Sequence, residues 1–118
     1  MDQLSEFERK AIAALAVNDP QRDIILAQLA CATCAARDYT GVGVYTEINV
    51  ATGAPKLEVT RSQAADAPRV YAEHPDVPAG VGLILWLKNG YISCLESYTY
   101  EGSWPSDESL FQLATYNS

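Results

Sequence analysis

Apolar residues recur at helical spacing in the first third of the chain and at alternating spacing afterwards. From Leu4 to Leu15 they fall three or four residues apart, which is the stripe of a helix that packs one face on a core. Ser5 and Glu8 have the Ser-x-x-Glu form of a capping box, in which each side chain satisfies a free amide at a helix start. The pattern predicts a first helix from about Glu6 to Val17.

A second helix is predicted directly after the first. Asp19 suits the N-cap, and Pro20 suits the first helical position, where its missing N–H costs nothing. Apolar residues at helical spacing continue to about Thr33. Because the link is so short, we expect residues 5–34 to form an antiparallel helical hairpin.

The hydrophobic period then changes from helical to alternating. Between Asp38 and Val50 the apolar side chains occupy even positions, which predicts one half-buried strand. Gly41 and Gly43 interrupt its outer face and indicate a bulge, a bend or the close approach of another backbone or ligand. A turn at 52–55 and a partner strand at 56–60 follow.

The sharpest local signal is Asn89-Gly90 between two strand-like runs. Both turn residues need positive φ, which Asn and Gly tolerate, so a hairpin of 81–87 with 91–100 is predicted. A short strand is expected at 69–73, and the two prolines in 74–80 predict a connection there. Beyond Gly102 we expect a short helix near 106–113, capped by Ser106 or Asp107.

Helices first and strands afterwards predict a single α+β domain, which is also what 118 residues allow. In this interpretation the helical hairpin (5–34) packs on an antiparallel sheet of about four to five strands (37–100). An acidic C-terminal tail (101–118) completes the chain.

A two-residue turn at Asn89-Gly90 would place Glu96 opposite Leu83, in an otherwise aliphatic row. A carboxylate there loses water unless it finds a cation or backbone donors. Glu96 is then either a functional carboxylate with a shifted pKa, or a ligand anchor. The alternative is a structural residue that pairs with Arg37 or lies at the sheet margin. A bulge in the hairpin would move Glu96 to the other face.

The outer face of the strand at 38–50 suggests a recognition surface. Tyrosine and arginine are enriched in binding hot spots, and these residues share the odd positions of that strand. The alternative is that the rings pack against loops or the tail. The candidate binding residues are Arg37, Tyr39, Tyr45, Glu47, Glu96, Tyr98 and Trp104, with Tyr100 as a possible extension.

Other candidate motifs are weaker. Cys31 and Cys34 have C-x-x-C spacing, but at the end of a predicted helix they lack the dipole that stabilises a thiolate, so two small buried residues are the preferred interpretation. One further cysteine and His74 do not complete a zinc site. We expect His74 to be a solvated loop residue, and no catalytic set, metal or cofactor is predicted.

Charge and composition limit the kinds of partner and the cellular location that we expect. The net charge is −7, and no Lys or Arg follows Lys88, so the field repels nucleic acid and favours a basic protein, unless the acidity serves only solubility. The longest apolar run is too short to cross a membrane, and no signal peptide is apparent. Three cysteines without dense spacing suit a reducing compartment, so we expect a cytoplasmic location.

Two segments carry a resemblance. Residues 37–46 (RDYTGVGVYT) and residues 82–105, with Leu95-Glu96-Ser97-Tyr98 and Trp104-Pro105, are similar to a group of small bacterial proteins with no established activity. That group carries R-x-[YF]-T-G-x-G after two helices, then a hairpin that ends in L-E-x-[YF] and W-P. The resemblance implies the same layout and no catalytic residue. In size and charge the chain also resembles immunity proteins, which neutralise secreted toxins.

The sequence therefore favours a non-enzymatic protein-binding module, with toxin immunity as its most concrete form. The alternative is a small-molecule binder or enzyme that uses Glu96 with Arg37 and Tyr39 in a pocket beside Gly41 and Gly43. A homodimer is compatible with either.

Overall fold

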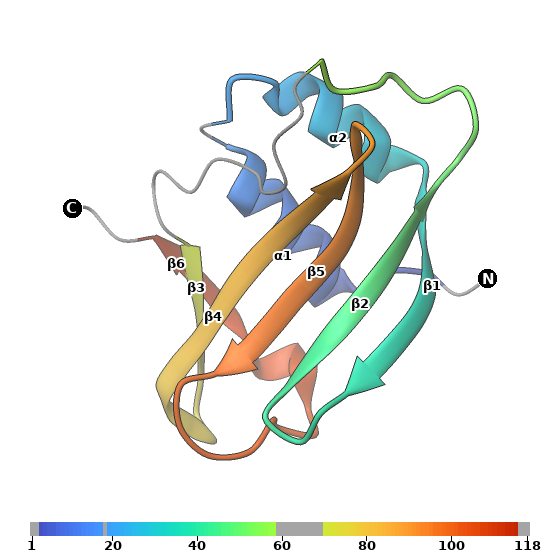
Figure 1. Ribbon diagram of the computed structural model, residues 1–118. Helices are drawn as coiled ribbons and strands as arrows, with labels where there is room; N and C mark the ends of the chain where they lie inside the picture. The colour runs from blue at the N-terminus through green and yellow to red at the C-terminus, as the bar shows by residue number, and fades with distance from the viewer. Residues whose placement is uncertain (1–2, 18, 59–69, 116–118) are drawn as a thin grey trace.

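The computed structural model describes residues 3–17, 19–58 and 70–115. Its elements are α1 (Glu6–Ala16), α2 (Arg22–Ala30), β1 (Ala32–Tyr39), β2 (Gly43–Val50), β3 (Val70–His74), β4 (Val77–Lys88), β5 (Tyr91–Thr99), the 3-10 turn η1 (Glu108–Leu110) and β6 (Gln112–Thr115). The α+β prediction is confirmed, and the sheet has six strands rather than four to five, in the antiparallel order β1-β2-β5-β4-β3-β6 (Figure 1).

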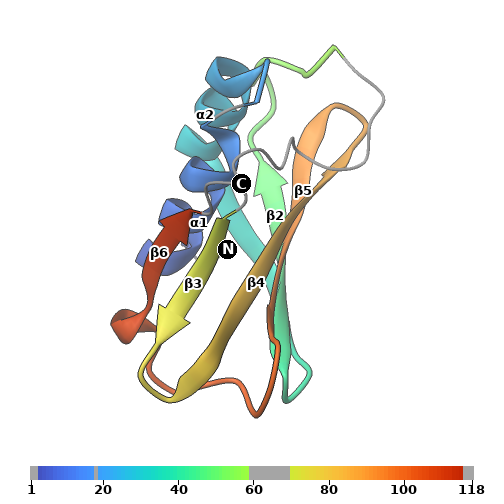
Figure 2. The same cartoon turned by 90° about the vertical axis from the view of Figure 1, so that its left-hand side faces the viewer.

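Both helices lie on one side of the sheet, and the other side of β2, β5 and β4 carries no helix (Figure 2). The layer between helices and sheet is the core, in which Ile12, Ile25, Leu85, Ile92 and Leu95 are fully buried. The antiparallel pairing of the two helices stays a prediction.

The capping box at the start of α1 is confirmed. The Ser5 Oγ accepts from the Glu8 backbone N–H at 3.1 Å, and the Ser5 N–H donates to Glu8 Oε1 at 2.7 Å. In contrast, α2 begins after Gln21, because Asp19 accepts from the Gln21 N–H at 2.8 Å and closes a separate turn before the helix.

The largest difference from the predicted structure lies in residues 32–50. The predicted single strand is a hairpin, in which β1 and β2 are joined by a turn at 40–42 where Gly41 has φ of 91°. Since β1 starts at Ala32, α2 ends three residues earlier than predicted, and the C-x-x-C pair spans the junction between α2 and β1. Cys31 is the C-cap of α2, and Cys34 is buried in β1.

The predicted connection at 74–80 is also wrong. Only Pro75 and Asp76 form the turn, and β4 starts at Val77 with Pro78 inside it. The pairing of β3 with β4 shifts register between Ala72 and His74, and such an irregularity is where a strand accepts a proline. The Asn89-Gly90 hairpin is confirmed, with φ of 54° and 84° at the two turn residues.

The C-terminal tail joins the sheet. Asp107 caps η1, as predicted, but the expected helix near 106–113 is only this one turn, and Gln112–Thr115 pair with β3 as β6. At residues 56–58 no strand is present, and residues 59 and 60 of the expected partner strand lie outside the described residues. The Leu57 N–H instead donates to the Gly90 carbonyl at 2.9 Å, which ties this segment to the hairpin turn.

Candidate functional site

The hairpin of β1 and β2 separates the four residues that were expected to share one face. Residues opposite each other in a sheet project to the same side, and Tyr39 lies opposite Val44 while Arg37 lies opposite Thr46. Val44 and Thr46 are buried, and the Thr46 hydroxyl donates to Glu8 of α1, so Arg37 and Tyr39 belong to the helix side of the sheet. Tyr45 and Glu47, at alternating positions of β2, project to the opposite side.

Arg37 is held by Glu8 of α1. Its Nη2 and Nε donate to Glu8 Oε1 and Oε2 at 2.7 and 2.8 Å, and the buried Thr46 hydroxyl donates to Oε2 at 2.7 Å. Burial pushes the pKa of Glu8 up, but the hydrogen bonds from Arg37, the Ser5 backbone and Thr46 outweigh it, so the pKa lies below its ordinary value. The hydrogen bond to Glu8 raises the pKa of Arg37. This closed ion pair ties α1 to β1 and β2.

Glu96 therefore has neither Arg37 nor a place in the core. Instead of facing Leu83, it lies opposite Ile84 on β4 and Tyr45 on β2, on the open side of the sheet. The pairing of β4 with β5 shifts between Trp86 and Leu87, and this irregularity moves Glu96 to the other face. Its Oε1 accepts from the Trp86 indole N–H at 3.0 Å.

The open side of β2, β5 and β4 carries a mixed aromatic and acidic surface, which we call the outer face. Cross-strand pairing places Tyr45 beside Glu96, and Glu47 beside Cys94 and then Trp86. Its defining residues are Tyr45, Glu47, Trp86, Cys94, Glu96 and Tyr98. Burial, with a smaller effect of the nearby charges of Glu47 and Glu96, raises the pKa of the Cys94 thiol to about 11.

Two glycines leave room for the Tyr98 side chain and for the backbone of β5. Gly43 and Gly82 flank Tyr98 on the neighbouring strands, and a side chain at Gly82 would collide with the hydroxyl end of the Tyr98 ring. A side chain at Gly43 would collide with the backbone of β5. The sequence signal for a close approach at Gly43 is therefore confirmed, and the approaching group is the protein's own backbone. Tyr100 contacts the Tyr98 ring edge to face, with centroids 5.6 Å apart.

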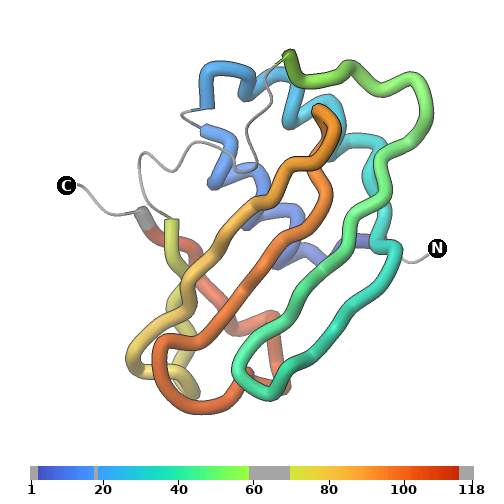
Figure 3. The backbone as a smooth tube through the Cα atoms, viewed as in Figure 1, coloured from blue at the N-terminus to red at the C-terminus, as the bar shows by residue number. Residues whose placement is uncertain are grey.

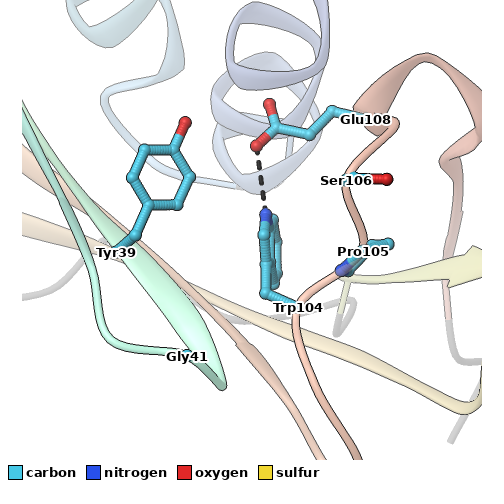
Figure 4. Close-up of a pocket in the computed structure, with 6 residues that line it drawn as sticks. All are labelled: Tyr39, Gly41, Trp104, Pro105, Ser106 and Glu108. Carbon is cyan, nitrogen blue, oxygen red and sulfur yellow. Dashed lines mark hydrogen bonds between the residues drawn. The ribbon is translucent and has the colours of Figure 1, made fainter.

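Trp104 does not lie on the outer face but in a separate cleft. The turn at 40–42 lies beside the chain that leaves β5 (Figure 3), and the Trp104 N–H donates to the Gly41 carbonyl at 2.9 Å. Between these segments is a cleft of about 550 Å³, lined by Tyr39, Gly41, Trp104, Pro105, Ser106 and Glu108 (Figure 4). The Trp104 indole N–H donates to Glu108 Oε2 at 3.1 Å. Tyr39 is 58% exposed, and the partial burial of its side chain, with a smaller effect of Glu108, raises the pKa of its hydroxyl.

His74 is buried rather than solvated, which corrects the sequence interpretation. Its Nδ1 accepts from the Asp76 N–H at 3.0 Å, so Nε2 carries the proton that it shares with the Asp107 carbonyl at 2.7 Å. Its ring contacts Phe111, with centroids 4.8 Å apart. These contacts join the turn between β3 and β4 to η1, a structural role.

Sequence reasoning missed three side chains that form contacts at these candidate sites. Trp86 and Glu108 each pair an indole with a carboxylate, and Glu8 binds Arg37. A signal existed for Trp86, because it alternates with Leu83, Leu85 and Leu87 along β4 and therefore faces away from the core that buries those leucines. Nothing in the sequence marked Glu108 as a neighbour of Tyr39.

No family model, curated protein or solved structure matches this chain. Among the described residues, no group of three or more His, Cys, Asp or Glu side chains is placed to hold a metal ion. Within the same residues, neither helix has the length and apolar character that a bilayer span requires.

Proposed function

We propose that this chain is a non-enzymatic protein-binding module that engages a basic protein through its outer face. The observation that carries the proposal is the face itself: the strand register puts aromatic and acidic side chains of β2, β5 and β4 on one side of the sheet. No helix covers that side (Figure 2). Tyrosine and tryptophan supply large contact areas at low conformational cost, which is why they dominate binding hot spots.

Charge supports a basic partner. Glu47 and Glu96 lie on the outer face, and Asp38 lies opposite Tyr45 at its margin. Within the described part of the chain, none of these three carboxylates forms an ion pair. With a net charge of −7, two copies of the chain would repel each other across this face. A partner of opposite charge is therefore favoured over a second copy.

Immunity against a bacterial toxin is the most concrete form of this proposal. A small acidic protein with a rigid binding face can neutralise a basic toxin by covering it, and such binding needs no catalytic group. Electrostatic complementarity would steer the encounter and accelerate association.

The test is affinity capture with the full chain from an extract of cells that encode it. We expect one basic protein to be retained by the natural chain and lost with the Tyr45→Ala and Glu96→Gln variants. Raising the ionic strength from about 0.05 to 0.5 M should weaken the association by roughly tenfold or more.

Matched controls lie on the helix side. Leu26 and Val17 are exposed, at 37% and 44%, so Leu26→Ala and Val17→Ala should leave capture unchanged. An acidic partner, a salt-insensitive association, or capture lost only with the helix-side variants would contradict the proposal.

A further inference from the structure

The cleft between the turn at 40–42 and the segment 104–108 has no part in the proposed function, since Tyr39 lies on the helix side of the sheet. Its volume of about 550 Å³ is within the range of small-molecule sites, roughly 300 to 1,000 Å³. The backbone around it is tied down: the Thr99 hydroxyl contacts the carbonyls of Val42 and Gly102 at 2.9 and 3.0 Å, and the Trp104 N–H binds Gly41. The cleft is thus largely pre-formed.

Two aromatic rings and one carboxylate face this space. In Figure 4 the Tyr39 and Trp104 rings stand on opposite sides of it, and the Glu108 side chain reaches over from the far segment. The Trp104 ring is fixed from behind by Phe111, with centroids 5.2 Å apart, and by Phe7 at 6.4 Å. Aromatic faces and a carboxylate both attract cations, and neither attracts anions.

The charges around the cleft leave Glu108 uncompensated. Arg37, whose charge acts on Tyr39, is paired with Glu8 through two hydrogen bonds. Lys10, on the other side of Glu108, pairs with Glu6 at 2.8 Å. Across the described residues, Glu108 forms no ion pair, and only one of its oxygens is engaged by the Trp104 indole.

We propose that this cleft binds a guanidinium group, as carried by arginine. A guanidinium is planar and weakly hydrated, so it can stack on a flat ring while its edge donates hydrogen bonds to a carboxylate. The Tyr39 and Trp104 rings at the two sides of the cleft, with Glu108 at one end, provide both contacts. A quaternary ammonium would use the rings but offer no donor to Glu108, so the site favours the guanidinium.

The test is an NMR titration that follows the two indole N–H resonances. Trp104 reports on the cleft, and Trp86, whose indole also donates to a glutamate but on the outer face, is an internal control. With N-acetyl-arginine methylamide we expect a saturable shift of the Trp104 resonance, with a Kd on the order of 0.1–10 mM, and no shift of Trp86. The uncharged citrulline analogue should shift neither.

Matched variants separate binding from folding. Glu108→Gln should weaken binding at least tenfold, whereas Glu73→Gln, the same change at an exposed carboxylate that accepts from the Tyr71 hydroxyl, should leave it unchanged. Tyr39→Leu should weaken it severalfold, and Tyr39→Phe much less. Backbone amide spectra of each variant verify that the fold is retained.

The source of the cation is distinguished by a second probe. Tighter binding of the capped arginine than of methylguanidinium would support a protein side chain as the ligand, and the reverse would support a free small molecule. An unshifted Trp104 resonance at about 50 mM probe, equal binding of the citrulline analogue, or unchanged binding by the Glu108→Gln variant would overturn the proposal. None of these outcomes bears on the outer face, so this site and the proposed function fail separately.

Discussion

Replacing Glu8 by glutamine isolates the charge of a buried carboxylate that accepts hydrogen bonds from three other residues. The Glu8 carboxylate accepts from four donors: the Ser5 N–H, two nitrogens of Arg37 and the Thr46 hydroxyl. Its side chain is only 3% exposed, and that of Arg37 is 23% exposed. Glutamine keeps the shape and the N-terminal capping bond, since Gln serves in capping boxes as Glu does.

The magnitude follows from what glutamine cannot do. It cannot bind Arg37 through two oxygens or neutralise its charge, and hydrogen bonds to charged groups contribute about 1.5–3 kcal/mol each. Breaking a buried ion pair costs about 3–5 kcal/mol, which we reduce because water reaches part of Arg37. We therefore expect Glu8→Gln to lower the free energy of unfolding by about 2–4 kcal/mol, a large share of the roughly 5–15 kcal/mol typical of a domain.

Urea denaturation at pH 7, followed by tryptophan fluorescence, measures this loss. The control is Glu6→Gln, which removes an exposed carboxylate from the same helical turn and should change nothing measurable. In the double variant with Arg37→Gln, we expect the combined loss to be smaller than the sum of the two single losses, because both changes break the same bonds.

The pH dependence has a definite sign. The pKa of Glu8 in the folded protein lies below its ordinary value of about 4.3, so its contribution is fully present above that pH and disappears as the pH falls through the folded pKa. The difference in stability between the natural chain and Glu8→Gln should therefore be constant near pH 7 and narrow below about pH 4. A loss under about 0.5 kcal/mol, or a difference that persists unchanged at pH 3, would refute this account.

Three further predictions concern packing and reactivity. Gly43→Ala should destabilise more than Gly82→Ala in urea denaturation, by at least about 1 kcal/mol, because the first side chain meets rigid backbone and the second meets the movable end of a ring. Alkylation of Cys94 at pH 8 should be roughly two orders of magnitude slower than that of a free thiol, given its pKa of about 11, and Glu47→Gln should accelerate it, as mass spectrometry can follow. Gln28→Leu should cost about 2–5 kcal/mol, again measured in urea, because the buried amide contacts two carbonyls at 2.8 and 2.9 Å and a backbone N–H at 2.8 Å that would lose their partners.

Signals that act within a few residues predicted the structure well. The capping box at Ser5 and the Asn89-Gly90 turn depend on the backbone immediately around them, and both are present as expected. The change from helical to alternating hydrophobicity correctly predicted an α+β fold, because it reports which side of each element faces the core.

Features that depend on distant pairing were not predictable. Residues 32 and 33 were predicted to end the second helix, yet pairing with β2 makes them the start of β1. Residues 112–115 carry no strong strand pattern, and their hydrogen bonds to β3 bring them into the sheet. The hairpin at 40–42 also reverses which positions face the core, since Tyr39 lies opposite Val44, and this reversal divided the expected surface of Arg37, Tyr39, Tyr45 and Glu47.

The position of Glu96 shows how the cost of burying a carboxylate selects between two registers of the β4–β5 hairpin. If the hairpin kept the register of its turn, Glu96 would enter the core opposite Leu83, and an unpaired carboxylate there costs several kcal/mol, on the order of the whole stability of a domain. One extra residue in β5, Ser93, avoids this at the cost of a locally disrupted ladder. Beyond that bulge, Leu95 is fully buried and Glu96 lies outside, beside the Trp86 indole. The same irregularity that protects the core therefore gives the outer face the carboxylate on which its proposed binding of a basic partner depends.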